Sequence, residues 1–191
     1  MNHGMHELLG ALKALAEVTR IRIILVLSRG ELNVTELTQI LDQSQPRVSR
    51  HLKLMLEAGL ITRHKPGHWV LFRVGEVGVS AELANSIVQM LPISEAVVAA
   101  DLRRLQDVKF RRAETAAAYF SANAQNWQKL RSLHLDENKV ESRIKAMIGR
   151  EPVETLVDLG TGTGRMLELF AGQARRLVGI DLSREMLTYA R

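Results

Sequence analysis

The spacing of apolar residues changes at Gly59, and this change limits the fold more than any other feature of the sequence. Before Gly59, apolar residues recur at helical spacing in two short segments, residues 33–41 and 44–58, with a short turn between them. After it, residues 60–74 alternate between apolar and polar and are interrupted by Pro66-Gly67, which is typical of a β-hairpin. Two short helices followed by a hairpin predict a winged helix-turn-helix.

The short helices carry recognisable start signals. Asn33 precedes Glu36 by three residues, which is the spacing of a capping box. Ser44 is expected to begin the next helix, with Pro46 in its first turn, where the missing amide proton does no harm. Upstream, Thr19 is expected to cap a further helix.

Positive charge is concentrated in the same part of the chain. The whole sequence has a formal net charge of +5. Residues 43–73 contain six basic side chains and one acidic side chain, whereas residues 1–42 contain four basic and five acidic side chains. A basic segment that includes a helix-turn-helix and a hairpin favours a nucleic acid as the partner.

The second helix of this segment has one polar face. Apolar residues at helical spacing, among them Val48, Leu52 and Met55, are expected to face the core. The polar residues between them then face solvent, where glutamine and arginine match base edges, while lysine and hydroxyl groups suit phosphate oxygens. The predicted DNA-binding residues are Ser44, Gln45, Arg47, Ser49, Arg50 and Lys53 on the helix and Arg63 and Lys65 on the wing.

This segment resembles a known family. The run Gln43-Ser44-Gln45-Pro46-Arg47-Val48-Ser49-Arg50-His51-Leu52-Lys53, followed by Leu56-Glu57-Ala58-Gly59-Leu60-Ile61, is similar to the recognition helix and the start of the wing in ArsR/SmtB regulators. The resemblance spans roughly residues 5–90. It implies a homodimer, paired through segments around residues 8–15 and 79–91, that binds a palindromic operator in double-stranded DNA and acts as a repressor. The alternative is a helix-turn-helix that serves protein contact or supports an enzyme.

The sequence departs from the metal-sensing members of that family. Cysteine is absent, which excludes disulfides and thiolate metal sites. Many ArsR proteins sense metals through cysteines in the helix that corresponds to residues 31–37, where this chain has Asn33 and Thr35. A second metal site of the family uses Asp and His on the last helix, where this chain supplies no imidazole. We interpret His64 and His68 as solvated wing residues and expect no metal.

A glycine-rich motif near the carboxyl end predicts a second kind of site. An apolar strand over residues 153–159 leads into Gly160-Thr161-Gly162-Thr163-Gly164, and a second strand over residues 176–180 ends in Asp181. Asp181 lies 21 residues beyond Gly160 (181 − 160), the distance at which a Rossmann-like unit places a carboxylate on ribose hydroxyls. The third glycine comes one residue too early for the dinucleotide fingerprint. The alternative is a purely structural βαβ unit.

The glycine-rich motif resembles motif I of class I methyltransferases, which bind S-adenosylmethionine. The resemblance implies that Asp158 and the backbone from Gly160 through Thr161 to Gly162 approach the methionine part of the cofactor. It implies that Asp181 accepts hydrogen bonds from both ribose hydroxyls. The expected cofactor is S-adenosylmethionine or S-adenosylhomocysteine.

The chain between these two motifs reads as helical. Residues 94–126 are rich in alanine, arginine and glutamate, which predicts one long helix or two. We interpret the aromatic residues Tyr119, Phe120 and Trp127 as core packing rather than as ligand contacts. The basic residues Arg103, Arg104, Lys109, Arg111 and Arg112 are interpreted as a solvated helix face.

These segments predict a mainly α fold with a β-hairpin wing, followed by a helical linker and the opening βαβ of a Rossmann-like α/β domain. The expected domains are an ArsR-type winged-helix DNA-binding and dimerisation domain (1–92), a helical linker and lead-in (93–150), and the first part of a class I methyltransferase-like domain that binds S-adenosylmethionine (151–191). No acid or base can be paired with a substrate pocket, so we predict no catalytic residue. We expect a truncated chain, because the sequence stops inside the helix after the second strand.

The expected function is sequence-specific transcription regulation by a dimeric repressor. Resemblance to fusions of ArsR and methyltransferase domains implies a response to S-adenosylmethionine or S-adenosylhomocysteine and control of methionine and methyl-cycle genes. The alternatives are a methyltransferase with an appended DNA-binding domain and a DNA-binding module without a ligand. The longest apolar stretch, residues 23–27, is too short to cross a bilayer, and the start of the sequence lacks a signal-peptide pattern. We therefore expect a cytoplasmic protein without a membrane partner.

Overall fold

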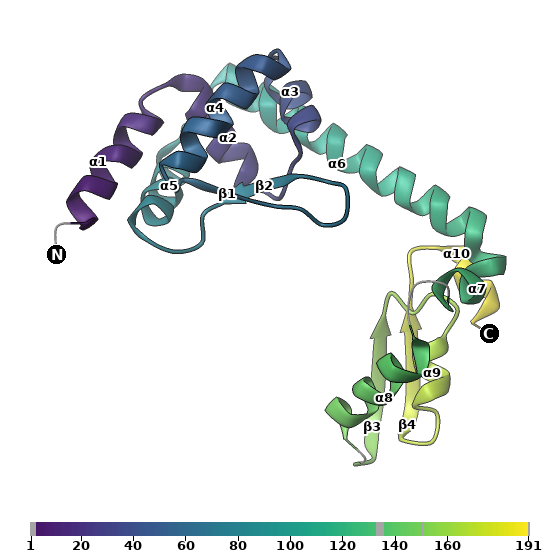
Figure 1. The fold of residues 1–191 in the computed structure, drawn as a ribbon. Coiled ribbons are helices and arrows are strands. Elements are labelled where there is room, and N and C mark those ends of the chain that lie inside the picture. The colour runs from purple at the N-terminus through teal and green to yellow at the C-terminus, as the bar shows by residue number, and fades with distance from the viewer. Residues whose placement is uncertain (1–2, 133–135, 150, 191) are drawn as a thin grey trace. The chain divides into compact units, whose positions relative to one another are not determined.

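The computed structural model describes residues 3–132, 136–149 and 151–190 (Figure 1). The chain divides into two compact units, Met1–Phe110 and Arg111–Arg191, which we call unit 1 and unit 2. None of the helices among the described residues has the length and apolar composition that crossing a bilayer requires.

Unit 1 is a helical domain with a β-hairpin (Figure 1). Its two strands pair in antiparallel register from Ile61↔Val74 to His64↔Leu71, and Leu32 forms a bridge with Phe72. The elements are α1 (His3–Leu15), α2 (Val18–Leu27), α3 (Val34–Leu41), α4 (Gln45–Glu57), β1 (Ile61–His64), β2 (Leu71–Val74), α5 (Val79–Met90) and the first part of α6 (Ala96–Asn123). The predicted winged helix-turn-helix is therefore confirmed, with α3 and α4 as its two helices.

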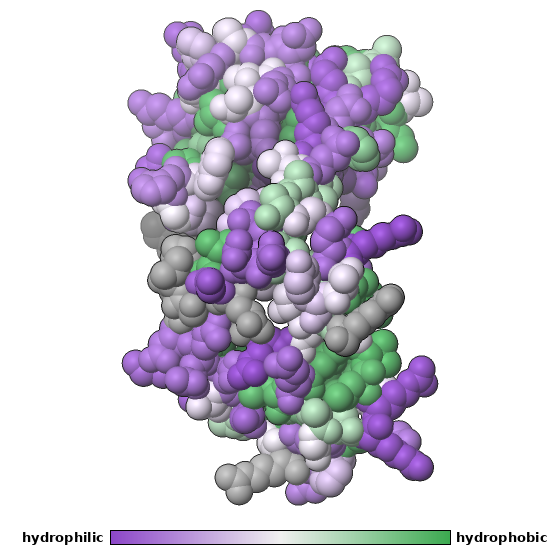
Figure 2. Space-filling view, turned by 90° about the vertical axis from the view of Figure 1, so that its right-hand side faces the viewer, coloured by the Kyte–Doolittle hydropathy of each residue, from purple (hydrophilic) through white to green (hydrophobic). Residues whose placement is uncertain are grey.

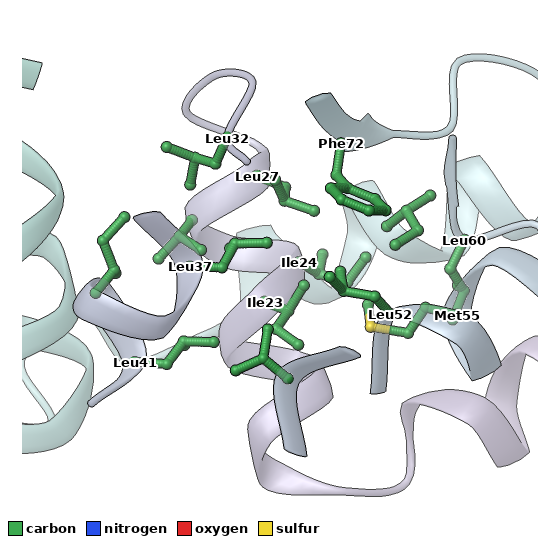
Figure 3. Packing of buried hydrophobic residues seen from close by; sticks show 14 of the residues in the cluster. Ile23, Ile24, Leu27, Leu32, Leu37, Leu41, Leu52, Met55, Leu60 and Phe72 are labelled. Atoms are coloured by element: carbon green, nitrogen blue, oxygen red, sulfur yellow. The ribbon is translucent and has the colours of Figure 1, made fainter. Parts of the chain in front are cut away.

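The hydrophobic core of unit 1 surrounds α2. Four consecutive α2 residues, Ile23 to Val26, have exposed fractions of 0%, which is typical of a helix that is covered on all sides. Apolar side chains of α3, α4 and the hairpin pack around it, as Figure 3 shows for Leu37, Leu52 and Phe72. Leu105 and Val108 of α6 belong to the same cluster. The first half of a helix that the sequence places in a linker thus contributes to the core of unit 1.

The starts of the helices follow the sequence signals at α3 and depart from them at α2. Asn33 Oδ1 accepts the Glu36 amide proton at 2.9 Å, and Glu36 Oε2 accepts the Asn33 amide proton at 2.8 Å, so the predicted capping box is confirmed. At α2 the cap is Glu17, whose carboxylate accepts the Arg20 amide proton at 3.0 Å. The prediction that Thr19 caps this helix is wrong, because the cap lies two residues earlier and Thr19 is buried within the helix.

Unit 2 contains the predicted βαβ unit. Strands β3 (Val153–Leu159) and β4 (Ala174–Ile180) pair in parallel, and α9 (Arg165–Leu169) lies between them in the chain (Figure 1). The other elements are the second part of α6, η1 (Ala124–Asn126), α7 (Trp127–Ser132), α8 (Glu137–Ile148) and α10 (Arg184–Tyr189). Residues 96–123 form one long helix rather than two.

Candidate functional site

Helix α4 presents a polar face above the core of unit 1. Val48, Leu52 and Met55 are buried, with exposed fractions of 0–2%. The polar residues between them lie in solvent because a helix turns them away from the core. The predicted residues Ser44, Gln45, Arg47, Ser49, Arg50 and Lys53 are all exposed. This face therefore has the donors that base edges and phosphates require.

The start of α4 adds to this face. Ser44 is the N-cap and Pro46 lies in the first turn, as predicted. The Ser44 side chain makes no capping hydrogen bond within the described chain. The amides of the first turn and the positive end of the helix dipole can therefore bind an anion such as a phosphate group.

The wing brings two further predicted residues to the surface. Arg63 on β1 and Lys65 in the following turn are both exposed. A hollow of about 630 Å³ between α4 and the hairpin brings Ser49, Lys53 and Arg63 around one space, whereas Lys65 does not line it. Its other lining residues are Val34, Leu52, Leu56, Glu57 and Phe72.

The base of the wing is held by ion pairs. Glu31, just before α3, lies 3.3 Å from His64 Nε2 and 3.8 Å from the Arg73 guanidinium. Arg73 also lies 2.9 Å from Glu76. His64 is only partly solvated, because its imidazole lies against Glu31, whereas His68 is exposed as expected. In the described part of the chain, no group of three or more His, Asp or Glu side chains is placed to hold a metal ion.

Unit 2 contains a mostly apolar pocket at the carboxyl ends of its two strands. Its volume is about 690 Å³. The predicted residues Gly160, Gly162 and Asp181 line it, together with Ala113, Ala116, Ala117, Phe120, Trp127, Leu159, Ile180, Leu182, Ser183 and Met186. Leu159, Ile180 and Leu182 are more than half exposed. Figure 2 shows that hydrophobic side chains, in green, gather in places on the face of the molecule that it displays. The end of parallel strands is where α/β folds bind ligands.

Asp181 is the carboxylate among the residues that line this pocket. Its Oδ2 accepts the Gly162 amide proton at 2.8 Å, and its Oδ1 accepts the Ser183 amide proton at 2.8 Å. A carboxylate oxygen can accept two hydrogen bonds, so each oxygen retains an acceptor site for a ligand. Asp181 therefore holds the glycine loop in place and can still accept ribose hydroxyls.

Two predicted cofactor residues do not line the pocket. Asp158 is half-buried and Thr161 is buried. Asp158 Oδ2 and Thr161 Oγ1 are buried and have no hydrogen-bond partner among the described residues. An unpaired buried carboxylate oxygen favours a ligand with an amino or hydroxyl group. The pocket itself offers apolar walls, the backbone of the glycine loop and the Asp181 carboxylate, which can meet a ligand that has both apolar parts and hydroxyl groups.

The aromatic residues near the pocket differ from their interpretation. Tyr119 and Phe120 are exposed by 54% and 39%, so reading them as core residues is wrong. Phe120 and Trp127 line the pocket and meet edge to face, with ring centroids 5.3 Å apart. The alanines Ala113, Ala116 and Ala117 were not identified from the sequence. With Phe120 they occur at helical spacing, which is a detectable signal of one helix face.

Comparison with known proteins identifies the first unit. Residues 17–63 match the family model described as "Bacterial regulatory protein, arsR family". Over 76 residues the chain is 36% identical to the arsenical resistance operon repressor of Bacillus subtilis, a match that covers 39% of this chain and 72% of that protein. This chain belongs to the ArsR family. The arsenical resistance operon repressor of Escherichia coli is 52% identical over 63 residues, which is 32% of this chain and 54% of the relative.

The other comparisons also cover parts of this chain or of the relatives. The first curated relatives are matched over about half of their length, 54% and 49%. The solved structure of the transcriptional repressor BigR from Xylella fastidiosa is similar with a TM-score of 0.44 and 26% identity, covering 48% of this chain and 89% of that chain. Residues 157–191 match a model described as "Methyltransferase domain".

The matched segments of this ArsR-family chain include most of the predicted site residues. Residues 17–63 contain every predicted DNA-binding residue except Lys65. Residues 157–191 contain all of the predicted cofactor residues. The segment matched to the ArsR family therefore includes the polar face of α4. The segment matched to the methyltransferase model includes the strand ends that line the pocket.

Proposed function

We propose that this chain is a DNA-binding transcription regulator of the ArsR type that acts as a repressor. The observation that carries the proposal is the face of α4, where Gln45, Arg47 and Arg50 are exposed directly above a buried apolar face. In this mode α4 enters the major groove, while the wing residues Arg63 and Lys65 contact the backbone. A regulator of this kind acts on DNA in the cytoplasm.

The proposed regulator is a homodimer on a palindromic operator. Met5, Leu9 and Leu12 of α1 are exposed by 63%, 46% and 44%. Such a row of apolar side chains on one helix is typical of a surface that another protein covers. Met90 on α5 is also exposed, by 76%. Pairing through α1 and α5 would place two α4 helices on the two halves of a palindrome.

The DNA-binding proposal is tested by removing charges from α4. Arg47→Ala and Arg50→Ala should each weaken operator binding by about 1–3 kcal/mol and relax base preference, because arginine reads base edges. Lys65→Ala should mainly reduce the salt dependence of binding. Arg175→Ala is the control, since this exposed arginine lies on β4 of unit 2 and its loss removes the same charge. Equal binding by all the variants would contradict the assignment of α4.

The pocket of unit 2 is proposed to bind S-adenosylmethionine or S-adenosylhomocysteine and to make DNA binding respond to it. Support comes from the methyltransferase match and from the acceptor sites that Asp181 retains beside apolar walls. The proposed targets are genes of methionine and methyl-group metabolism. When bound, the adenosyl amino acid would change the affinity of the regulator for its operator.

An operator titration tests the ligand response. The full chain is titrated with labelled operator in the absence of ligand and with each adenosyl ligand at saturation. A change in operator affinity with either ligand supports the sensor, and identical affinities in all three titrations would leave only a DNA-binding module. Asp181→Asn should weaken ligand binding, measured by calorimetry without DNA, because an amide accepts fewer hydrogen bonds than a carboxylate.

The second candidate function is methyl transfer, which the methyltransferase match favours. The experiment is transfer of a labelled methyl group from S-adenosylmethionine by the full chain, with operator DNA and protein offered as acceptors. Transfer that Asp181→Asn reduces would support this function over the sensor alone.

A further inference from the structure

A buried ion cluster attaches α6 to the helix-turn-helix within unit 1. Asp101 on α6 has a side-chain exposed fraction of 0%. It accepts hydrogen bonds from Arg22 Nε at 2.6 Å and Arg22 Nη2 at 2.7 Å, and from Arg104 Nη2 at 2.8 Å. A bidentate arginine and a second guanidinium on one buried carboxylate fix its position closely.

Both arginines also bind the end of α3. Arg22 Nη2 donates to the Leu41 carbonyl at 2.9 Å, and Arg104 Nε donates to the Ile40 carbonyl at 2.5 Å. Cations at the carboxyl end of a helix satisfy free carbonyls and complement the dipole. The next residue, Asp42, has a left-handed backbone with φ of 54° and begins the turn to α4. Asp101 therefore fixes the point from which the DNA-reading helix departs.

The other half of α6 belongs to the pocket of unit 2. Its residues Ala113, Ala116, Ala117 and Phe120 line that pocket. Ser121 Oγ donates to Glu185 Oε2 at 2.9 Å, and the same oxygen accepts the Ser183 hydroxyl proton at 3.1 Å. Ser183 lines the pocket and donates its amide proton to Asp181. One hydrogen-bonded chain therefore joins α6 to the carboxylate that would meet a ligand.

We propose that α6 transmits the occupancy of the pocket to the helix-turn-helix, with Ser121 bonded to Glu185 at one end and with Asp101 and Arg104 as positioning residues at α3. The proposal rests on the proposed ligand response. A ligand that moves the segment from Asp181 to Ser183 changes the hydrogen bond between Glu185 and Ser121. Movement of α6 then changes the hydrogen bonds from Arg104 to the carbonyl group at the end of α3. Such coupling changes DNA affinity only by the difference in ligand affinity between the two states.

The test compares variants of the full chain by one ratio. This ratio is the operator affinity without ligand divided by the operator affinity with saturating S-adenosylhomocysteine. The measurement is repeated with S-adenosylmethionine. Coupling of this kind commonly gives a ratio that differs from one by about 5- to 150-fold. Arg104→Ala should bring the ratio to within about twofold of one. Calorimetry without DNA should show ligand affinity within about twofold of wild type, because Arg104 does not line the pocket. Arg103→Ala, the exposed neighbour on α6, should keep the wild-type ratio.

A second pair of variants tests the other end. Ser121→Ala removes the bond to Glu185, while Thr115→Ala removes only a hydrogen bond to the Arg111 carbonyl within the same helix. Ser121→Ala should reduce the ratio and Thr115→Ala should not. If Arg104→Ala does not fold, Ser121→Ala decides the proposal. Transmission through α6 would be overturned if Ser121→Ala, or a folded Arg104→Ala, had the same ratio as the wild type. The proposed ligand response would not be affected by that result. If the wild-type protein itself gave a ratio of one, the ligand would not affect operator binding. That result would overturn the proposed ligand response and, with it, transmission through α6.

Discussion

His51 is the least exposed titratable residue of α4. Its Nδ1 is 3.7 Å from Glu17 Oε2, which is too long for a hydrogen bond. Burial lowers the pKa of His51, the Glu17 carboxylate acts in the opposite direction, and the nearby arginines at positions 20, 47 and 50 lower the pKa further. Burial and the nearby guanidinium groups therefore favour the neutral form of the His51 imidazole.

Stability is predicted to fall as the pH drops below about 6.5, the ordinary pKa of histidine. The lowered pKa means that unfolded chains bind the His51 proton more readily, so its contribution is fully present above that value and is lost as the pH falls through the pKa of the folded state. Urea unfolding between pH 8 and pH 5 measures the effect. His51→Gln should flatten this slope, and His68→Gln on the exposed wing should not. A slope unchanged by His51→Gln would assign the titration to other groups.

Helix α3 shows how a short element is stabilised at both ends. It has only eight residues, a length at which an isolated helix is unstable in water. The capping box of Asn33 and Glu36 satisfies its first amides, and the guanidinium groups of Arg22 and Arg104 satisfy its last carbonyls. The orientation of α3 is thus set by contacts at its two ends as well as by its buried face.

Removal of the capping box should destabilise unit 1. Asn33→Ala is predicted to lower the free energy of unfolding by about 0.5–2 kcal/mol, because the Glu36 amide loses its acceptor. Thr35→Ala on the exposed side of α3 is the control and should change stability by less than about 0.5 kcal/mol. Denaturant unfolding followed by circular dichroism measures both. Equal losses in the two variants would show that the cap contributes nothing specific.

At the scale of the whole molecule, α6 is shared by two units. Its residues Leu105 and Val108 pack in the core of unit 1, while Ala116 and Phe120 line the pocket of unit 2. Each half of α6 therefore packs within a different unit. A change in either unit can therefore act on the same helix.

The contribution of α6 to unit 1 is measurable. Leu105 has an exposed fraction of 3%, and Leu105→Ala should lower the stability of unit 1 by about 2–5 kcal/mol through lost burial and the cavity left behind. Phe110→Ala is the control, since Phe110 is 64% exposed on the same helix. Hydrogen exchange of the α2 amides reports on unit 1 directly. Unchanged α2 protection in Leu105→Ala would mean that α6 does not support this core.

Several features followed from the sequence because their signals are local. The change of period at Gly59 predicted the helices and the wing, and residues 153–159 form the predicted strand. The capping box was readable because its two residues lie three positions apart. The cap of α2 was not, since glutamate is not among the residues preferred at this position and only the structure places the Glu17 carboxylate on the Arg20 amide.

By itself the sequence determined the elements, their order and the polar face of α4, because these depend on spacing within a few turns of chain. Only the tertiary structure placed Asp101 on Arg22, 79 residues away. It showed that Arg104, one of the basic residues interpreted as a solvated helix face, binds the buried carboxylate of Asp101. It also showed that Asp181 holds the Gly162 amide and that Phe120 lines a pocket rather than a core. Such contacts join residues distant in sequence, and only packing of whole elements decides which of them meet.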